Sequence, residues 1–143
     1  MVDDPDAGVG EIFSVETESP TQSIDISARV AERVQRSGVR NGLCHVMVLH
    51  STAAVVVNET ADPNIGLDVI DALDRAVPLR GDWRHDRIDD NAHSHIKASI
   101  LGPSETIPVR NGELVLGTWQ GIWLIEFDGP RKRSVSVYLL SAS

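Results

Sequence analysis

The sequence predicts an α+β protein with an antiparallel β-sandwich core and two to three helices. Two helical patterns occur in the first half of the chain, whereas the second half consists mostly of short β-type segments joined by turns. Asn111-Gly112 and Asp128-Gly129 are the clearest of these turns. A length of 143 residues fits one domain. We therefore expect a flexible acidic tail over residues 1–10 and a single domain over residues 11–143.

The first elements of this domain are a strand and a helix. Residues 11–17 alternate between two side-chain sets, as in a strand. Asp25 stands where a helix N-cap is expected, ahead of apolar residues at helical spacing, and Gly38 is typical of the position after a helix. The pattern predicts a helix over about residues 26–37.

Two apolar segments rich in β-branched residues follow, over residues 43–50 and 53–58. They predict two paired strands at the centre of the sheet. A second helix begins at Asp62, an N-cap followed by proline at the first helical position, and ends before Pro78.

The segment over residues 79–91 is polar and lacks periodicity. A connection of this length inside a small domain is more often functional than idle. Residues 92–101 fit either a short helix or a strand, and periodicity does not decide between them. The remaining β-type segments are residues 106–109, 113–116, 119–127 and 133–140.

Composition excludes several classes of protein. Lys and Arg together number 13 against 21 Asp and Glu, and the net charge of -8 repels a nucleic-acid backbone. No apolar run approaches the roughly 18 to 20 residues that span a bilayer. The single cysteine, Cys44, has no partner for an internal disulfide. We expect a cytoplasmic protein that binds neither nucleic acid nor membranes.

Histidines are the first candidate functional residues, because imidazoles from different elements can bind a divalent metal. His50 ends an apolar strand, His85 lies on the polar segment, and His93 and His95 are two residues apart. A strand would place the last two on one face, whereas a helix would separate them by about 200°. We predict His50, His85 and His95 as ligands of Zn²⁺ or Mg²⁺. The plain alternative for each is a structural, hydrogen-bonded imidazole.

Glu59, Asp62 and Gln120 are candidate catalytic residues. If the two central strands form a hairpin, Glu59 comes close to His50, where a carboxylate can act as a general base or orient an imidazole. A helix cap by itself also explains Asp62. Gln120 shares a strand face with Glu126 and apolar residues, and polar groups on such a face need partners if they are buried.

Cationic and hydroxyl side chains form a candidate phosphate site. Lys97, Arg131 and Arg133 supply positive charge, and Ser51, Thr52 and Ser99 supply hydroxyl donors. Lys97, Arg131, Ser51 and Thr52 are the predicted phosphate ligands. A solvated charge run is the plain alternative for Arg131. The sequence contains no P-loop, no dinucleotide-binding glycine motif and no Gly-x-Ser-x-Gly. Because these cationic and hydroxyl side chains suit a phosphate group, we expect the partner to be a small phosphorylated molecule.

Four segments resemble the YjbQ-type proteins, a family of small proteins named secondary thiamine-phosphate synthases. The most specific matches are LGTWQGI and the spacing of His-Ser-Thr-Ala, Asn-Glu and Asp-Pro. The segments are HSTAAVVVNETADP (50–63), HDRIDDNAHSHIKASILGPSETIPV (85–109), GELVLGTWQGI (112–122) and DGPRKRSVSV (128–137).

The resemblance implies a compact α+β fold that assembles as a homotrimer, with a site at or near the subunit interface. It also implies an activity that joins hydroxymethylpyrimidine diphosphate to thiazole phosphate and releases diphosphate. A metal-dependent hydrolase or lyase of a small phosphorylated or heterocyclic metabolite is one alternative, and a non-enzymatic trimeric ligand-binding module is another. The positions that match the family are His50, His85, His95, Lys97, Glu59, Asp62, Gln120 and Arg131.

Overall fold

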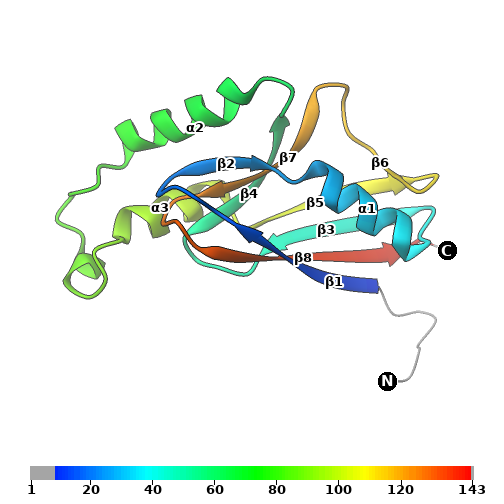
Figure 1. Ribbon diagram of the computed structural model, residues 1–143, viewed down its shortest axis with the longest axis horizontal. Coiled ribbons are helices and arrows are strands. Elements are labelled where there is room, and N and C mark those ends of the chain that lie inside the picture. Colours follow the sequence, from blue (N-terminus) through cyan, green and yellow to red (C-terminus); the bar gives the residue numbers. More distant parts are fainter. Residues whose placement is uncertain (1–8, 143) are drawn as a thin grey trace.

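The computed structural model describes residues 9–142, which form two antiparallel sheets and three α-helices (Figure 1). The five-stranded sheet has the order β1-β8-β3-β5-β6, and the three-stranded sheet has the order β2-β7-β4. This architecture confirms the predicted α+β class with antiparallel sheets. The strands are β1 (Val9–Glu16), β2 (Gln22–Asp25), β3 (Gly42–Val48), β4 (Ala53–Glu59), β5 (Ser104–Arg110), β6 (Glu113–Leu114), β7 (Gln120–Glu126) and β8 (Lys132–Ser141). The helices are α1 (Ser27–Ser37), α2 (Pro63–Ala76) and α3 (Ala92–Leu101), with a short 3-10 helix at Arg84–Arg87.

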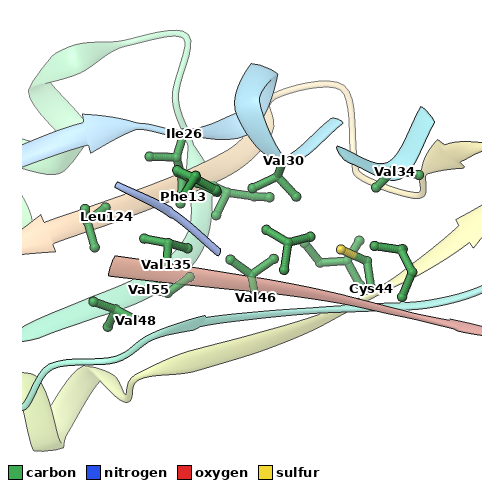
Figure 2. Close-up of a cluster of buried hydrophobic side chains, with 14 of the residues drawn as sticks. Phe13, Ile26, Val30, Val34, Cys44, Val46, Val48, Val55, Leu124 and Val135 are labelled. Carbon is green, nitrogen blue, oxygen red and sulfur yellow. The ribbon is translucent and has the colours of Figure 1, made fainter. Parts of the chain in front are cut away.

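The main hydrophobic core lies between the two sheets and is closed on one side by α1 (Figure 2). Alternate residues of β8 point into this core, and Val135 is wholly buried there. Helix α1 contributes Val30 and Val34, which lie one turn apart on its buried face. Gly38 ends the helix in the left-handed conformation at φ 73°, as predicted.

A second buried cluster lies between the three-stranded sheet and the helices α2 and α3. It joins Trp123 and Phe127 on one side to Ile70 of α2 and Ala98 of α3 on the other. Strand β7 is therefore covered on both faces, which explains why its sequence is a nearly continuous apolar run. Within residues 9–142, no helix is long and apolar enough to cross a membrane.

The predicted hairpin between residues 43–50 and 53–58 is wrong. Strand β3 pairs with β5 and β8, whereas β4 pairs with β7 in the other sheet. The connection at Ser51 and Thr52 therefore crosses from one sheet to the other. Local sequence does not distinguish these arrangements, because both bury the same apolar residues and differ only in long-range pairing.

Other boundaries differ by a few residues. The tail predicted over residues 1–10 lies mostly outside the described residues, and β1 begins at Val9, two residues before the predicted start of the domain at Glu11. Helix α1 begins at Ser27, whose backbone N–H and hydroxyl both donate to the Asp25 carboxylate. Of the two alternatives for residues 92–101, the helix is confirmed.

Cys44 provides a first test of this core. Burial raises the pKa of its thiol to about 11, and the thiolate is the reactive form of cysteine. We expect the folded protein at about pH 8 to react with an aromatic disulfide reagent at least about 100-fold more slowly than the protein unfolded in urea. The absorbance of the released thiol measures both rates, and similar rates would contradict the burial of Cys44.

Candidate functional site

A polar cleft of about 420 Å³ is lined by residues of the β3–β4 connection, of α3 and the segment before it, and of the β7–β8 turn. These segments lie on the left in Figure 1. We call this cleft the histidine cleft. The β3–β4 connection, the segment leading into α3 and the β7–β8 turn meet here, which brings distant parts of the sequence together. The polar residues that line it are His50, Ser51, Thr52, Asp89, Asn91, His95, Asp128, Arg131 and Arg133.

A buried ion pair contributes its arginine, Arg133, to the lining of the histidine cleft. Arg133 is only 2% exposed and Glu126 is wholly buried. The arginine Nε donates to both carboxylate oxygens of Glu126, at 2.9 and 3.0 Å, and Nη2 donates to the Thr52 hydroxyl at 2.8 Å. The Thr17 hydroxyl also donates to Glu126, at 2.7 Å. Because these bonds use Nε and Nη2, Nη1 of Arg133 has no hydrogen-bond partner among the described residues.

Arg131 lies at the rim of the cleft and is about half exposed. Its Nε donates to the carbonyl oxygen of Asp128 at 2.7 Å, and its Nη2 donates to the carboxylate of the same residue at 2.9 Å. The Asn91 amide donates to that carboxylate as well, at 2.9 Å. Asp128 therefore fixes the guanidinium of Arg131 while leaving its Nη1 without a partner among residues 9–142.

Two hydrogen bonds join His50 and the residue before it to Ser134, near the start of β8. The ring Nε2 of His50 accepts a hydrogen bond from the backbone N–H of Ser134 at 2.9 Å. The preceding residue, Leu49, donates its own N–H to the carbonyl oxygen of Ser134 at 2.9 Å. Burial of the ring, together with the positive charge of Arg133, lowers the pKa of His50 below its ordinary value. The imidazole is therefore neutral at physiological pH.

His85 and His95 lie edge to face, with ring centroids 4.7 Å apart. The Nε2 atom of His85 is buried without a hydrogen-bond partner and lies 3.8 Å from a carboxylate oxygen of Asp89. Because residues 92–101 form a helix, His93 lies on a different side from His95 and its Nε2 contacts the Ser94 hydroxyl at 3.2 Å. His95, rather than His93, lines the cleft.

The three predicted metal ligands do not form one cluster within a single chain. Across the described residues, no group of three or more His, Cys, Asp or Glu side chains is arranged to hold a metal ion. His85 lies beside His95, but the Nε2 atom of His50 already accepts the Ser134 N–H. A divalent metal here stays a prediction.

The predicted catalytic residues lie at the opposite end of the β4–β7 pair. Ala53 faces Glu126 beside the histidine cleft, whereas Glu59 faces Gln120 six residues along the strand. That separation corresponds to about 20 Å at the rise of a β-strand. The expected approach of Glu59 to His50 is therefore wrong within one chain, because β3 and β4 belong to different sheets.

The remaining predicted residues of that group have local structural partners. Asp62 caps α2 by accepting the Asn64 N–H at 2.9 Å, as predicted from the helix pattern. The side-chain oxygen of Gln120 accepts the N–H of Gly117 at 2.8 Å, which holds the loop before β7.

Among the predicted phosphate ligands, Ser51, Thr52 and Arg131 line the histidine cleft, whereas Lys97 does not. Lys97 is 3% exposed and contacts the carboxylate of Asp74 in α2. It therefore joins α3 to α2 rather than facing a ligand.

Sequence reasoning missed Asp128 as a cleft residue. It left Arg133 as either a phosphate-binding cation or part of a solvated charge run, and Asn91 as part of either a metal-side cluster or a plain turn. Arg133 stands in a basic run that resembles a solvated face, and the other two lie in turn-like sequences. One signal was present: Glu126 occurs on an otherwise apolar strand, and a buried carboxylate requires a cationic or hydrogen-bonding partner. That partner is Arg133.

Comparisons with known proteins place the chain in a family. The family described as "UPF0047 protein YjbQ-like" matches residues 11–142. A UPF0047 protein of Methanothermobacter thermautotrophicus is 41% identical over 121 residues, which cover 85% of this chain and 84% of that protein. The UPF0047 protein YugU of Bacillus subtilis is 35% identical over 131 residues, which cover 90% of this chain and 96% of YugU.

Solved structures share the fold closely. A YbjQ-like protein of unknown function from Sulfolobus solfataricus has a TM-score of 0.90 at 39% identity, covering 94% of this chain and 97% of that one. An uncharacterized conserved protein of the yjbq/upf0047 family from Clostridium acetobutylicum has a TM-score of 0.87 at 44% identity, covering 91% and 99% of the two chains. These matches extend over nearly the whole described fold and confirm the resemblance inferred from the four sequence segments. The chain belongs to the YjbQ-like UPF0047 family.

Proposed function

We propose that the histidine cleft binds the phosphate groups of a small metabolite and that the protein acts as a secondary thiamine-phosphate synthase. The observation that carries the proposal is the pair of arginines, Arg131 and Arg133, in one cleft of a chain whose net charge is -8. The Glu126 carboxylate holds Arg133 through Nε and Nη2, whereas Asp128 holds Arg131 through its backbone carbonyl at Nε and its carboxylate at Nη2. In both arginines Nη1 has no partner among the described residues. Two held guanidinium groups match the geometry of phosphate oxygens.

The proposed reaction breaks the bond between the methylene carbon of the pyrimidine and the diphosphate oxygen. The electron pair of that bond leaves with the diphosphate, and the ring nitrogen of thiazole phosphate uses its lone pair to form the new C–N bond. Negative charge grows on the departing diphosphate in the transition state. Arg131 and Arg133 would stabilise this charge electrostatically, and the Ser51 hydroxyl would donate a further hydrogen bond.

An assay with the two substrates tests this activity. We expect diphosphate and thiamine phosphate to form in equal amounts, and only when both substrates are present. Release of diphosphate from the pyrimidine substrate alone would contradict the synthase and support a hydrolase. Binding of either substrate without any turnover would instead support the ligand-binding module.

A metal-dependent hydrolase or lyase is the second candidate, and it rests on the unpartnered Nε2 atom of His85. A buried imidazole nitrogen next to the Asp89 carboxylate and the His95 ring has the donor types that a divalent cation such as Zn²⁺ binds. His85, His95 and Asp89 are the residues that would hold the ion. When bound, the metal would polarise a phosphoryl or carbonyl oxygen of the substrate.

Elemental analysis tests the metal site directly. We expect stoichiometric metal in the wild-type protein, its loss in His85→Ala and His95→Ala, and its retention in His45→Ala, which alters a histidine on β3 outside the cleft. Circular dichroism would confirm that each variant folds. A wild-type protein that stays metal-free after incubation with Zn²⁺ or Mg²⁺ would contradict this candidate.

The homotrimer implied by the family resemblance is also part of the proposal, as is a cytoplasmic location. An apolar patch on the outer face of the five-stranded sheet supports self-association. The register places its members on one face, and they are Ile12, Leu43, Tyr138 and Leu140, each at least 44% exposed. Light scattering tests the assembly, and a monomeric mass would contradict it.

A further inference from the structure

We infer that His50 is a phosphate-binding residue that donates a hydrogen bond from its Nδ1–H group to a ligand oxygen, and that it does not bind a metal. The inference rests on the proposed phosphate site and names the atom of His50 that meets the ligand. It also separates His50 from the two histidines with which sequence reasoning grouped it.

The protonation of the ring follows from its backbone contact. The Ser134 N–H can only donate, so the Nε2 atom of His50 at 2.9 Å must carry a lone pair. A neutral imidazole has one N–H group, and in this ring the hydrogen therefore resides on Nδ1. Turning the ring over would place a carbon atom against the Ser134 N–H and lose the bond. The Leu49 N–H, which donates to the carbonyl of Ser134, keeps the two segments in register.

A metal ligand needs a lone pair, and neither nitrogen of this ring offers one to the cleft. The lone pair of Nε2 accepts the hydrogen bond from the Ser134 N–H, and Nδ1 carries the hydrogen. For Nδ1 to bind a metal, the hydrogen would have to move to Nε2, where it would face the Ser134 N–H donor. Metal binding at His50 therefore requires the loss of the Ser134 contact.

The Nδ1–H group is a donor without a partner among the described residues, and His50 shares its cleft with two cations. His50 lines the histidine cleft with Arg131 and Arg133, and no hydrogen bond within the described residues uses its Nδ1 atom. Among the described residues, the side-chain polar atoms that are buried without a partner belong to Arg33, His85, Asn91 and His93. The Nδ1 atom of His50 is not one of them, so solvent can reach it. A solvent-accessible donor in a cleft that also holds two guanidinium groups suits an anionic oxygen. The pKa of His50, lowered by burial and by Arg133, agrees with a ring that stays neutral.

Two substitutions separate the two nitrogens of the ring. His50→Asn places an amide N–H near the position of Nδ1 and removes the acceptor for Ser134. His50→Gln places an amide oxygen near the position of Nε2, which keeps the Ser134 contact, and removes the Nδ1 donor. The probe is inorganic diphosphate, and its affinity is measured by titration calorimetry in buffer that contains a chelator.

If Nδ1–H binds the phosphate, His50→Gln lowers the affinity for diphosphate by tenfold or more, while His50→Asn stays within about threefold of the wild type. If His50 binds only through a metal, chelated wild type and both variants bind equally weakly, and added Zn²⁺ or Mg²⁺ restores the wild type alone. Equal affinities for all three proteins would likewise overturn the inference.

The tautomer is measured independently by nitrogen NMR on protein labelled with ¹⁵N-histidine, with His50→Gln identifying the His50 signals. We expect the hydrogen on Nδ1 before any ligand is added. A hydrogen on Nε2 would overturn the inference whatever the affinities show. If the wild type binds no diphosphate with or without metal, both the proposed phosphate site and the ligand assigned to His50 are wrong. An Nδ1–H signal in that case would show that the tautomer is correct and that the proposed function is not.

Discussion

We expect Arg133→Met to lower the free energy of unfolding by about 3–5 kcal/mol, because it would leave the Glu126 carboxylate charged and without its cationic partner in the core. Glu126 is wholly buried and has Arg133 as its ion-pair partner, with the Thr17 hydroxyl as a further donor. Methionine has a similar length but donates no hydrogen bond. Urea denaturation followed by circular dichroism measures the change.

Two further variants make this result specific. Arg80→Met breaks an exposed ion pair with Asp90, and we expect it to lower the free energy of unfolding far less than Arg133→Met does, because water screens that pair. Replacing both buried partners, in Arg133→Met with Glu126→Leu, should recover much of the lost stability, since no unpaired charge then remains. A single Arg133→Met variant as stable as Arg80→Met would show that the buried pair is not formed in solution.

We expect Arg131→Ala to weaken the binding of diphosphate by about 10- to 100-fold, which is the usual effect of removing a charge-assisted contact with phosphate. Arg131 lines the cleft, is 53% exposed, and contacts Asp128 rather than the hydrophobic core. The variant should therefore fold normally, so that the loss appears in affinity and not in stability. Titration calorimetry with diphosphate measures the effect.

Lys132→Ala is the matched control for this prediction. It removes one positive charge from the adjacent residue, which is exposed and does not line the cleft. We expect its affinity for diphosphate to remain within about threefold of the wild type, because a charge at that distance acts only through screened electrostatics. Equal losses in the two variants would show that the net charge, rather than the position of Arg131, controls binding.

The candidate site shows where sequence reasoning succeeds and where it stops. His50, Ser51, Thr52, His95 and Arg131 were all singled out from sequence patterns or from the family resemblance, and all line one cleft. Lys97 was predicted as a phosphate ligand in the same way, but its side chain pairs with Asp74 of α2. A helix presents its residues in all directions, so the packing of the helix decides which of them meets a cleft.

The sequence by itself determined the α+β class, the limits of α2 from Asp62 to the residues before Pro78, and the family. The class and the limits of α2 depend on residues that are close in the chain, such as caps, turns and periodic apolar positions. The family follows from four short sequence segments. Only the tertiary structure decided that β3 and β4 belong to different sheets, which places Glu59 far from His50. It also decided that Glu126 pairs with Arg133 and that the Nε2 atom of His50 accepts the Ser134 N–H. Strand pairing and burial are set by the sum of many long-range contacts, and no local pattern records which of several equally apolar partners a strand will take.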